Sequence, residues 1–177
     1  MHSGAKLFKK LFKNEFFRAA VGGVVVILLT LLVGTRAYNG GGMDVIERIF
    51  EEGVVRPEAF LLKMIFTSIT IGAGFKGGEI VPTLFIGATL GGTLALLVGL
   101  SPAFGAAIGI AALFCGVTNC PIATILLSVE LFGGESALFC MIAALVSFLF
   151  SGYFSLYSGQ QLIYSKLSEK EINVHGH

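Results

Sequence analysis

A glutamate stands in an otherwise apolar part of the chain, inside the segment 77–82, which reads GGEIVP. Glycine allows a backbone turn that side chains would block, and it allows close approach of a ligand. Pro82 is typical of the first position of a helix, so the amides of Glu79, Ile80 and Val81 would point out of a helix N-terminus. Such an end carries about half a positive charge and unpaired N–H groups. The segment therefore predicts an anion site, with an ordinary broken-helix turn as the alternative.

The carboxylate of Glu79 is costly in apolar surroundings unless it is paired or protonated. Burial disfavours the charged form of an acid, so Glu79 could take up and release a proton. The functional interpretation is a proton-coupling residue. The alternatives are a glutamate at the membrane surface, or one paired with Lys63 or Lys76. Lys63 is expected to be a snorkelling or pairing residue rather than an ion ligand.

Two later polar positions have similar alternatives. The break at 118–121, which reads TNCP, favours a corner between two helices over a direct ligand contact. Tyr164 stands in a polar patch at 160–165. Its phenol can donate one hydrogen bond to an anion while staying neutral. A tyrosine of the interfacial belt is the alternative.

No catalytic pair and no metal cluster is visible in the sequence. The three histidines lie at the termini, and the three cysteines lie in or beside apolar segments without a CxxC spacing. Buried thiols are the expected state of these cysteines. We therefore expect no enzyme, no catalytic residue, no metal and no cofactor.

The composition places all of these residues in a membrane. Of the 177 residues, 55% are apolar and 13% charged, against about 25% charged in a soluble domain. Too little polar surface remains to cover a water-facing globule, so we expect an integral, multi-pass protein surrounded by lipid. The net charge of +1 gives no reason to expect nucleic acid. A basic cluster, which favours the cytoplasmic side, precedes the first apolar run at Lys6, Lys9, Lys10, Lys13 and Arg18.

The elements that would hold the candidate residues are uneven in length. Apolar stretches separated by glycine, proline or polar turns lie at 19–34, 57–71, 82–100, 103–115, 121–132 and 136–157. The stretch 136–157 is the best full span, 43–52 is a short amphipathic piece, and 160–170 predicts a helix that leaves the membrane. Irregular backbone at membrane depth persists only where protein or a polar cavity satisfies it. Short, broken segments indicate a transport site, so the pattern predicts an all-α channel or transporter.

The motif residues resemble those of the CLC chloride channels and proton-coupled antiporters. The segment 78–82 resembles the family's anion-site motif GxFxP, and the run 83–88 is similar to the helix that follows it. The stretch 119–130 resembles a later short helix that begins with proline and ends with glutamate. The segment 162–165 resembles the one that carries the anion-binding tyrosine. The order and spacing agree, and the resemblance extends from about residue 16 to residue 168.

The resemblance implies transmembrane transport of a halide, chloride or fluoride, with proton coupling. It implies an anion pathway lined by Gly78, Glu79, Ile80, Val81 and the Tyr164 hydroxyl. It also implies a homodimer in the plasma (inner) membrane, with 121–132 and 136–153 in the interface.

The implied fold is all-α, with the broken and tilted helices of one CLC-type inverted repeat and a closing C-terminal helix. Residues 1–15 would form a basic N-terminal segment, and 16–158 the second inverted repeat of a CLC-type transmembrane domain. Residues 159–177 would form the closing helix and a polar tail.

The sequence departs from the family pattern in two ways. The family has Phe at the position of Ile80 and usually an apolar residue at that of Glu79, where a glutamate resembles the fluoride/proton antiporter branch. Some members of that branch carry threonine at the position of Val81, so chloride and fluoride both stay open. The GSGIP and GREGP segments of the first repeat are not found, so we expect a fragment or one part of a split protein, completed by an N-terminal repeat. The alternative is an accessory subunit that completes another chain's pore.

Overall fold

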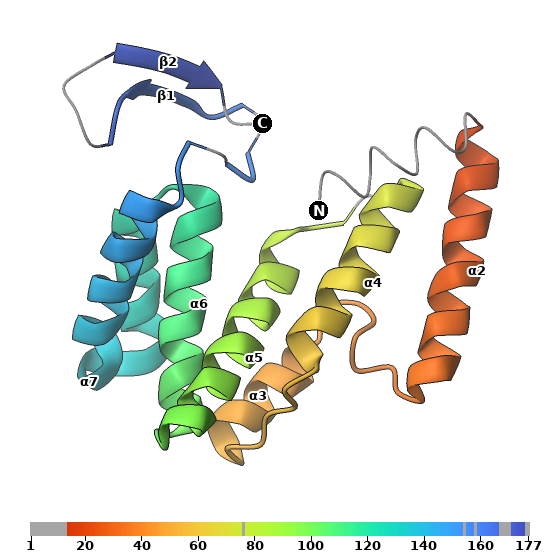
Figure 1. Cartoon of the computed structure of the whole chain (residues 1–177), viewed down its shortest axis with the longest axis horizontal. Helices are drawn as coiled ribbons and strands as arrows, with labels where there is room; N and C mark the ends of the chain where they lie inside the picture. Colours follow the sequence, from red (N-terminus) through yellow and green to blue (C-terminus); the bar gives the residue numbers. More distant parts are fainter. Residues whose placement is uncertain (1–13, 76, 154, 158, 167–170, 176–177) are drawn as a thin grey trace.

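The computed structural model describes residues 14–75, 77–153, 155–157, 159–166 and 171–175. The elements are α2 (Glu15–Val33), α3 (Met43–Glu51), α4 (Ala59–Ala73), α5 (Ile80–Val98), α6 (Pro102–Thr118), α7 (Pro121–Phe150), β1 (Gln161–Tyr164) and β2 (Glu171–His175). Figure 1 shows α2, α4, α5, α6 and α7 side by side in a row, with α3 at the lower end of α5. Apart from Asn14 and Glu15, the predicted basic segment 1–15 lies outside the described residues.

Left-handed residues end four of the helices. Gly34, Gly74 and Gly99 follow α2, α4 and α5 with φ of 71°, 96° and 78°. Asn119 follows α6 with φ of 55°. A residue in this conformation stops a helix while its N–H satisfies one of the last carbonyls, and glycine adopts it without a steric penalty. The predicted breaks after the first apolar run and before the GGEIVP segment are therefore confirmed.

Facing glycines hold α5 and α6 together. A Cβ added at Gly91 would lie 2.2 Å from the carbonyl oxygen of Gly105. One added at Gly109 would lie 2.2 Å from the carbonyl oxygen of Gly87. The two helix backbones are therefore in direct contact, the arrangement by which membrane helices gain packing energy.

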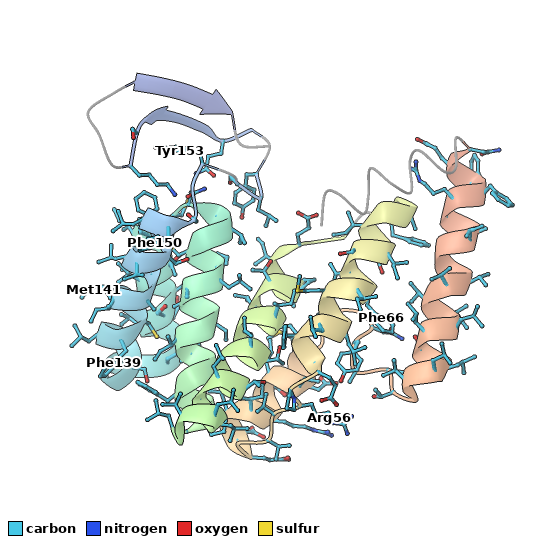
Figure 2. All side chains as sticks on the ribbon, viewed as in Figure 1. Arg56, Phe66, Phe139, Met141, Phe150 and Tyr153 are labelled. Atoms are coloured by element: carbon cyan, nitrogen blue, oxygen red, sulfur yellow. The ribbon has the colours of Figure 1, made fainter. Side chains whose placement is uncertain are left out.

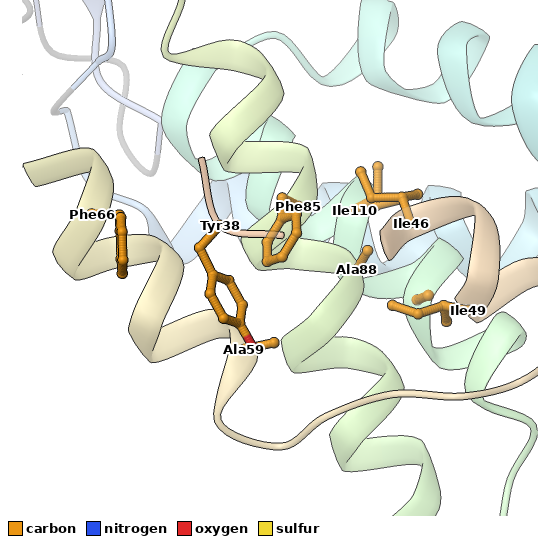
Figure 3. Packing of buried hydrophobic residues seen from close by; sticks show 9 residues of the cluster. Tyr38, Ile46, Ile49, Ala59, Phe66, Phe85, Ala88 and Ile110 are labelled. Carbon is orange, nitrogen blue, oxygen red and sulfur yellow. The ribbon is translucent and has the colours of Figure 1, made fainter. Parts of the chain in front are cut away.

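The buried core joins α3, α4, α5 and α6 to the turn after α2. Its fully packed members are Tyr38, Ile46, Ile49, Ala59, Phe66, Phe85, Ala88, Ala106 and Ile110. The Tyr38 ring lies 6.0 Å from the Phe66 ring and 6.2 Å, edge-on, from the Phe85 ring (Figure 3). The turn that carries Tyr38 is thereby fixed between α4 and α5.

The outer surface of the row is apolar. Leu32 of α2 is 82% exposed and Phe150 is 86% exposed. Figure 2 labels Phe150 at the end of α7. By length and composition, α2 and α5 could each cross a membrane, whereas α4, α6 and the two halves of α7 are shorter apolar helices. The predicted mixture of full and short apolar segments is present.

Two predicted helix boundaries are wrong. The helix α5 begins at Ile80, so Pro82 is its third residue and not its first. Proline is tolerated there because the first N–H groups of a helix have no internal partner. The full span predicted at 136–157 ends at Phe150, and Gly152 follows with φ of 68°. Within α7, Gly133 has φ of 71° and ψ of 178°, so the short helix predicted to end there does end there.

The predicted closing C-terminal helix is also wrong. Gln161–Tyr164 and Glu171–His175 pair as antiparallel strands, with Leu162 opposite Val174 and Tyr164 opposite Glu171. Apolar and polar residues alternate in 171–175, and such alternation favours a strand over a helix. Figure 1 shows the hairpin above the upper ends of α6 and α7. The upper side of the row is also where α5 begins.

Candidate anion site

The first turn of α5 presents amides that have no partner within the helix. Glu79 is the N-cap, and Ile80 and Val81 are the first two helical residues. The carbonyl of Glu79 accepts bonds from the Thr83 amide at 3.2 Å and the Thr83 hydroxyl at 2.8 Å. The amides of Ile80 and Val81 precede this first internal bond, and Pro82 has no N–H. The turn therefore has the form that the sequence predicts for an anion site.

The two glycines before this turn are not required by its backbone. Neither Gly77 nor Gly78 has a left-handed φ, and a Cβ added at either would meet nothing within 4 Å. The predicted turn that side chains would block is therefore wrong for the described residues. The open space beside both glycines leaves close approach of a ligand as the use of their small size.

The side chain of Glu79 lines a cavity of about 490 Å³. The carboxylate does not cap its own helix and forms no ion pair with any described residue. Of the partners predicted for it, Lys63 bonds elsewhere and Lys76 lies outside the described residues. The cavity wall is formed by Glu15, Arg18, Ala19, Ile71, Ala73, Gly74, Phe75, Gly77 and Glu79.

Arg18 is a buried cation in the same cavity wall. Its Nε donates to the carbonyl of Ala73 at 3.3 Å, and its guanidinium lies against Gly74. These are the last residues of α4, where the helix dipole is negative and favours a cation. The sequence predicts Arg18 only as a member of the basic cluster before the first apolar run. No local pattern could have placed it in the same cavity wall as Glu79, because only the packing of α2 on α4 does so.

A second cavity of about 490 Å³ adjoins the same turn. Val81 and Pro82 of α5 form part of its wall, and Ile71, Phe75 and Gly77 are shared with the first cavity. The rest of the wall is formed by Val26, Tyr38, Asn39, Gly40, Gly41, Phe66, Thr67, Thr70 and Gly78. The N-cap of α5 thus lines the first cavity, and the first turn of α5 lines the second.

Lys63 is fully buried behind this second cavity. Its ammonium donates to the carbonyls of Tyr38 at 3.2 Å and Gly40 at 2.7 Å, and it lies 4.9 Å from the centre of the Phe85 ring. The expected snorkelling is therefore wrong. The expected pairing is correct in kind, but the partners are backbone carbonyls of a turn that is distant in sequence.

The break at 118–121 is a corner between helices. Asn119 is buried, and its Oδ1 accepts bonds from the Ser151 hydroxyl at 3.2 Å and from the Lys166 ammonium. Lys166 also donates to the carbonyl of Phe148 at 2.7 Å. The polar side chain of Asn119 thus joins the α6–α7 corner to the end of α7.

The position of the Tyr164 hydroxyl stays a prediction. Tyr164 is the last residue of β1, and its side chain lies outside the described residues. Its strand lies on the upper side of the row of helices, as does the first turn of α5 (Figure 1).

Broken apolar helices border two cavities, one lined by Glu79 and the other by Val81, whose amide has no partner within α5. This construction is typical of a membrane protein that moves ions. Residues 1–152 match the family described as "Voltage gated chloride channel". The chain belongs to this family, the CLC proteins, and is therefore an integral, multi-pass membrane protein of a family of ion channels and transporters.

Relatives of this chain include proteins named for chloride and for fluoride. The chain is 37% identical over 171 residues to a chloride/fluoride channel protein of Pseudomonas syringae pv. tomato, covering 93% of this chain and 38% of the relative. It is 28% identical over 168 residues to the voltage-gated ClC-type chloride channel ClcB of Citrobacter koseri, covering 82% of this chain and 37% of the relative.

A solved structure has the same fold. The crystal structure of a CLC-type fluoride/proton antiporter superposes with a TM-score of 0.80 at 33% identity, covering 85% of this chain and 38% of the antiporter chain. The chain thus spans less than two fifths of the length of these relatives.

Proposed function

We propose that this chain supplies the second inverted repeat of a CLC-type transporter that exchanges a halide for protons. The observation that carries the proposal is the first turn of α5, where the amides of Ile80 and Val81 have no partner within the helix. A helix N-terminus holds an anion without a full positive charge at membrane depth, where such a charge is costly. Fluoride is the favoured ion, because the 37% identical relative and the 33% identical structure are both named for it.

In this proposal Glu79 exchanges the proton. Its carboxylate lines a cavity and is committed neither to its own helix nor to an ion pair with a described residue. An acid in that state can change its protonation without breaking the fold.

The rest of the proposed assembly follows the family resemblance. Gly78 gives the anion access to the turn, and the Tyr164 hydroxyl donates a hydrogen bond to it. The two halves of α7, Pro121–Gly134 and Ser136–Phe150, form part of a homodimer interface. The assembly lies in the plasma (inner) membrane, and an N-terminal repeat from other sequence completes the pathway.

The substitution Glu79→Gln tests this function in liposomes, with the chain in the assembly in which it purifies. A fluoride electrode and a pH electrode would record the two fluxes together. We expect the amide to abolish proton movement or to slow turnover strongly, because it cannot exchange a proton at this position. Binding of the anion at the α5 amides should change less.

Glu58→Gln is the matched control. Glu58 is also the N-cap of a helix, α4, and it is exposed. This variant should keep the proton and fluoride fluxes of the unchanged protein. Proton-coupled flux that is equally intact in Glu79→Gln would remove Glu79 from the mechanism.

A further inference from the structure

Thr67 is a buried residue whose hydroxyl is not used by the fold. In α4 and α5, Thr70, Thr83 and Thr89 each donate their hydroxyl to a carbonyl four residues earlier. Thr67 makes no such bond within the described residues, although it is only 8% exposed. Among the described residues, every fully enclosed side-chain nitrogen or oxygen has a hydrogen-bond partner. Because the Thr67 oxygen has no partner among these residues, it is not fully enclosed. The Thr67 hydroxyl therefore reaches the second cavity, whose wall it helps to form.

A positive charge lies behind the wall of this cavity, on the same helix face as Thr67. Lys63 precedes Thr67 by four residues on α4, so the two side chains share one face of the helix. The ammonium is held by the carbonyls of Tyr38 and Gly40, and both of these residues line the cavity. A buried cation in such a position makes the potential in a low-dielectric cavity positive. A hydroxyl that faces this potential is suited to donate to an anion.

The cavity is large enough for an ion with part of its water shell. Its volume of about 490 Å³ compares with roughly 30 Å³ for one water in the liquid. At one side it reaches Val81 and Pro82 in the first turn of α5. An ion at Thr67 would therefore stand in the same cavity as the turn that presents the free amides.

We propose that this cavity is a second halide subsite, in which the Thr67 hydroxyl donates a hydrogen bond to a partly hydrated chloride or fluoride beside the first turn of α5. The site rests on the proposed function, because the ion it holds is the one that α5 would bind. Lys63 acts from behind the wall and is not a ligand, since its ammonium is bound by backbone carbonyls.

Bromide locates such a site directly, because its anomalous scattering distinguishes it from water. We expect crystals of the purified assembly grown in sodium bromide to show one anomalous peak at the Ile80 and Val81 amides. We expect a second peak within hydrogen-bond distance of Thr67 Oγ1. In Thr67→Val, which keeps the shape of the side chain and removes the donor, the second peak should disappear while the first remains.

Thr70→Val is the matched control. Thr70 lies on the same helix and lines the same cavity, but its hydroxyl already donates to the carbonyl of Phe66 at 2.8 Å. This variant should keep both bromide peaks. In calorimetric titrations with bromide, Thr67→Val should weaken binding at the second site about five-fold, the equivalent of one hydrogen bond of about 1 kcal/mol. Thr67→Ser should restore the affinity.

The outcomes separate the subsite from the proposed function. A peak at the α5 amides without one at Thr67 overturns the subsite alone. A peak near Thr67 that survives unchanged in Thr67→Val also overturns it, because the hydroxyl is then not the ligand. The absence of bromide from both places, together with no binding in a calorimetric titration with fluoride, contradicts the anion site on α5 as well. Should Thr67→Val fail to fold, the bromide peak in the unchanged protein still tests the subsite, and so do the bromide affinities of Thr67→Ser and Thr70→Val.

Discussion

At the level of single residues, backbone carbonyls accept the hydrogen bonds of the buried cations Lys63 and Arg18. Lys63 is bound by the turn that carries Tyr38 and Gly40, and Arg18 is bound at the end of α4 by Ala73. A buried charge needs hydrogen bonds to replace its water. Carbonyls supply them without neutralising the charge. Both cations therefore keep a positive potential beside the cavities that adjoin α5.

The substitution Lys63→Met should destabilise the protein. It leaves the buried carbonyl of Tyr38 without its donor, which costs about 1–3 kcal/mol. Thermal unfolding followed with a thiol-reactive dye suits this chain, because Cys115 and Cys140 are buried and react only when the fold opens.

Arg56→Met is the control for that measurement. Arg56 is exposed, so its loss should change stability by no more than about 0.5 kcal/mol. Equal melting temperatures for Lys63→Met and Arg56→Met would mean that the Lys63 bonds contribute nothing to the fold.

At the level of elements, the contact between α2 and α4 determines where Arg18 lies. Gly22 of α2 packs on Ala73, and a Cβ added at Gly22 would lie 2.1 Å from the Ala73 Cβ. The neighbouring Gly23 has room, because its added Cβ would meet only the Phe75 ring at 3.9 Å. Gly22 thus permits the close approach that brings Arg18 to the end of α4.

Gly22→Ala should separate α2 from α4, whereas Gly23→Ala should not. Overpacking of this kind costs about 1–3 kcal/mol, while alanine in place of glycine within a helix otherwise stabilises by up to about 1 kcal/mol. Thermal melting of the two variants measures the difference.

A second substitution tests the cause. Ala73→Gly removes the atom that the new methyl group would meet, so the pair Gly22→Ala with Ala73→Gly should recover most of the lost stability. If Gly22→Ala melts like Gly23→Ala, the helices do not pack at this point.

At the level of the whole molecule, the chain has apolar outer faces and matches only part of the length of its relatives. It covers 38% of the length of both the 37% identical relative and the solved antiporter. The first turn of α5 also has an open side, since Ile80 is 37% exposed. We propose that first-repeat sequence covers this side of the turn.

Complementation tests that proposal. The chain would be co-expressed with the N-terminal part of the Pseudomonas syringae relative, which the match over 38% of that protein leaves uncovered. We expect the two to purify together and to move fluoride in liposomes, and we expect the chain by itself to be inactive. Halide flux from the chain alone would exclude both this proposal and an accessory role. A stable complex without flux would favour the accessory role.

The sequence alone was sufficient for the class of protein and for the break in the backbone before α5. Apolar composition places a chain in a membrane, and the glycine and proline positions determine where its helices break. Both depend on local chemistry. The turn before α5 could therefore be predicted to within two residues.

Only the tertiary structure decided what faces that turn. The partners of Lys63 lie 23 and 25 residues away in sequence, and the partner of Arg18 lies 55 residues away. No local pattern encodes such pairs, because they depend on which helices pack together. Thr67 differs from Thr70, which lines the same cavity, because only the Thr70 hydroxyl donates to a carbonyl four residues earlier. The C-terminal hairpin likewise depends on two strands meeting, whereas 160–170 alone reads as a helix. Local chemistry thus determined where the backbone breaks before α5, and long-range packing determined the charges and hydroxyls around that break.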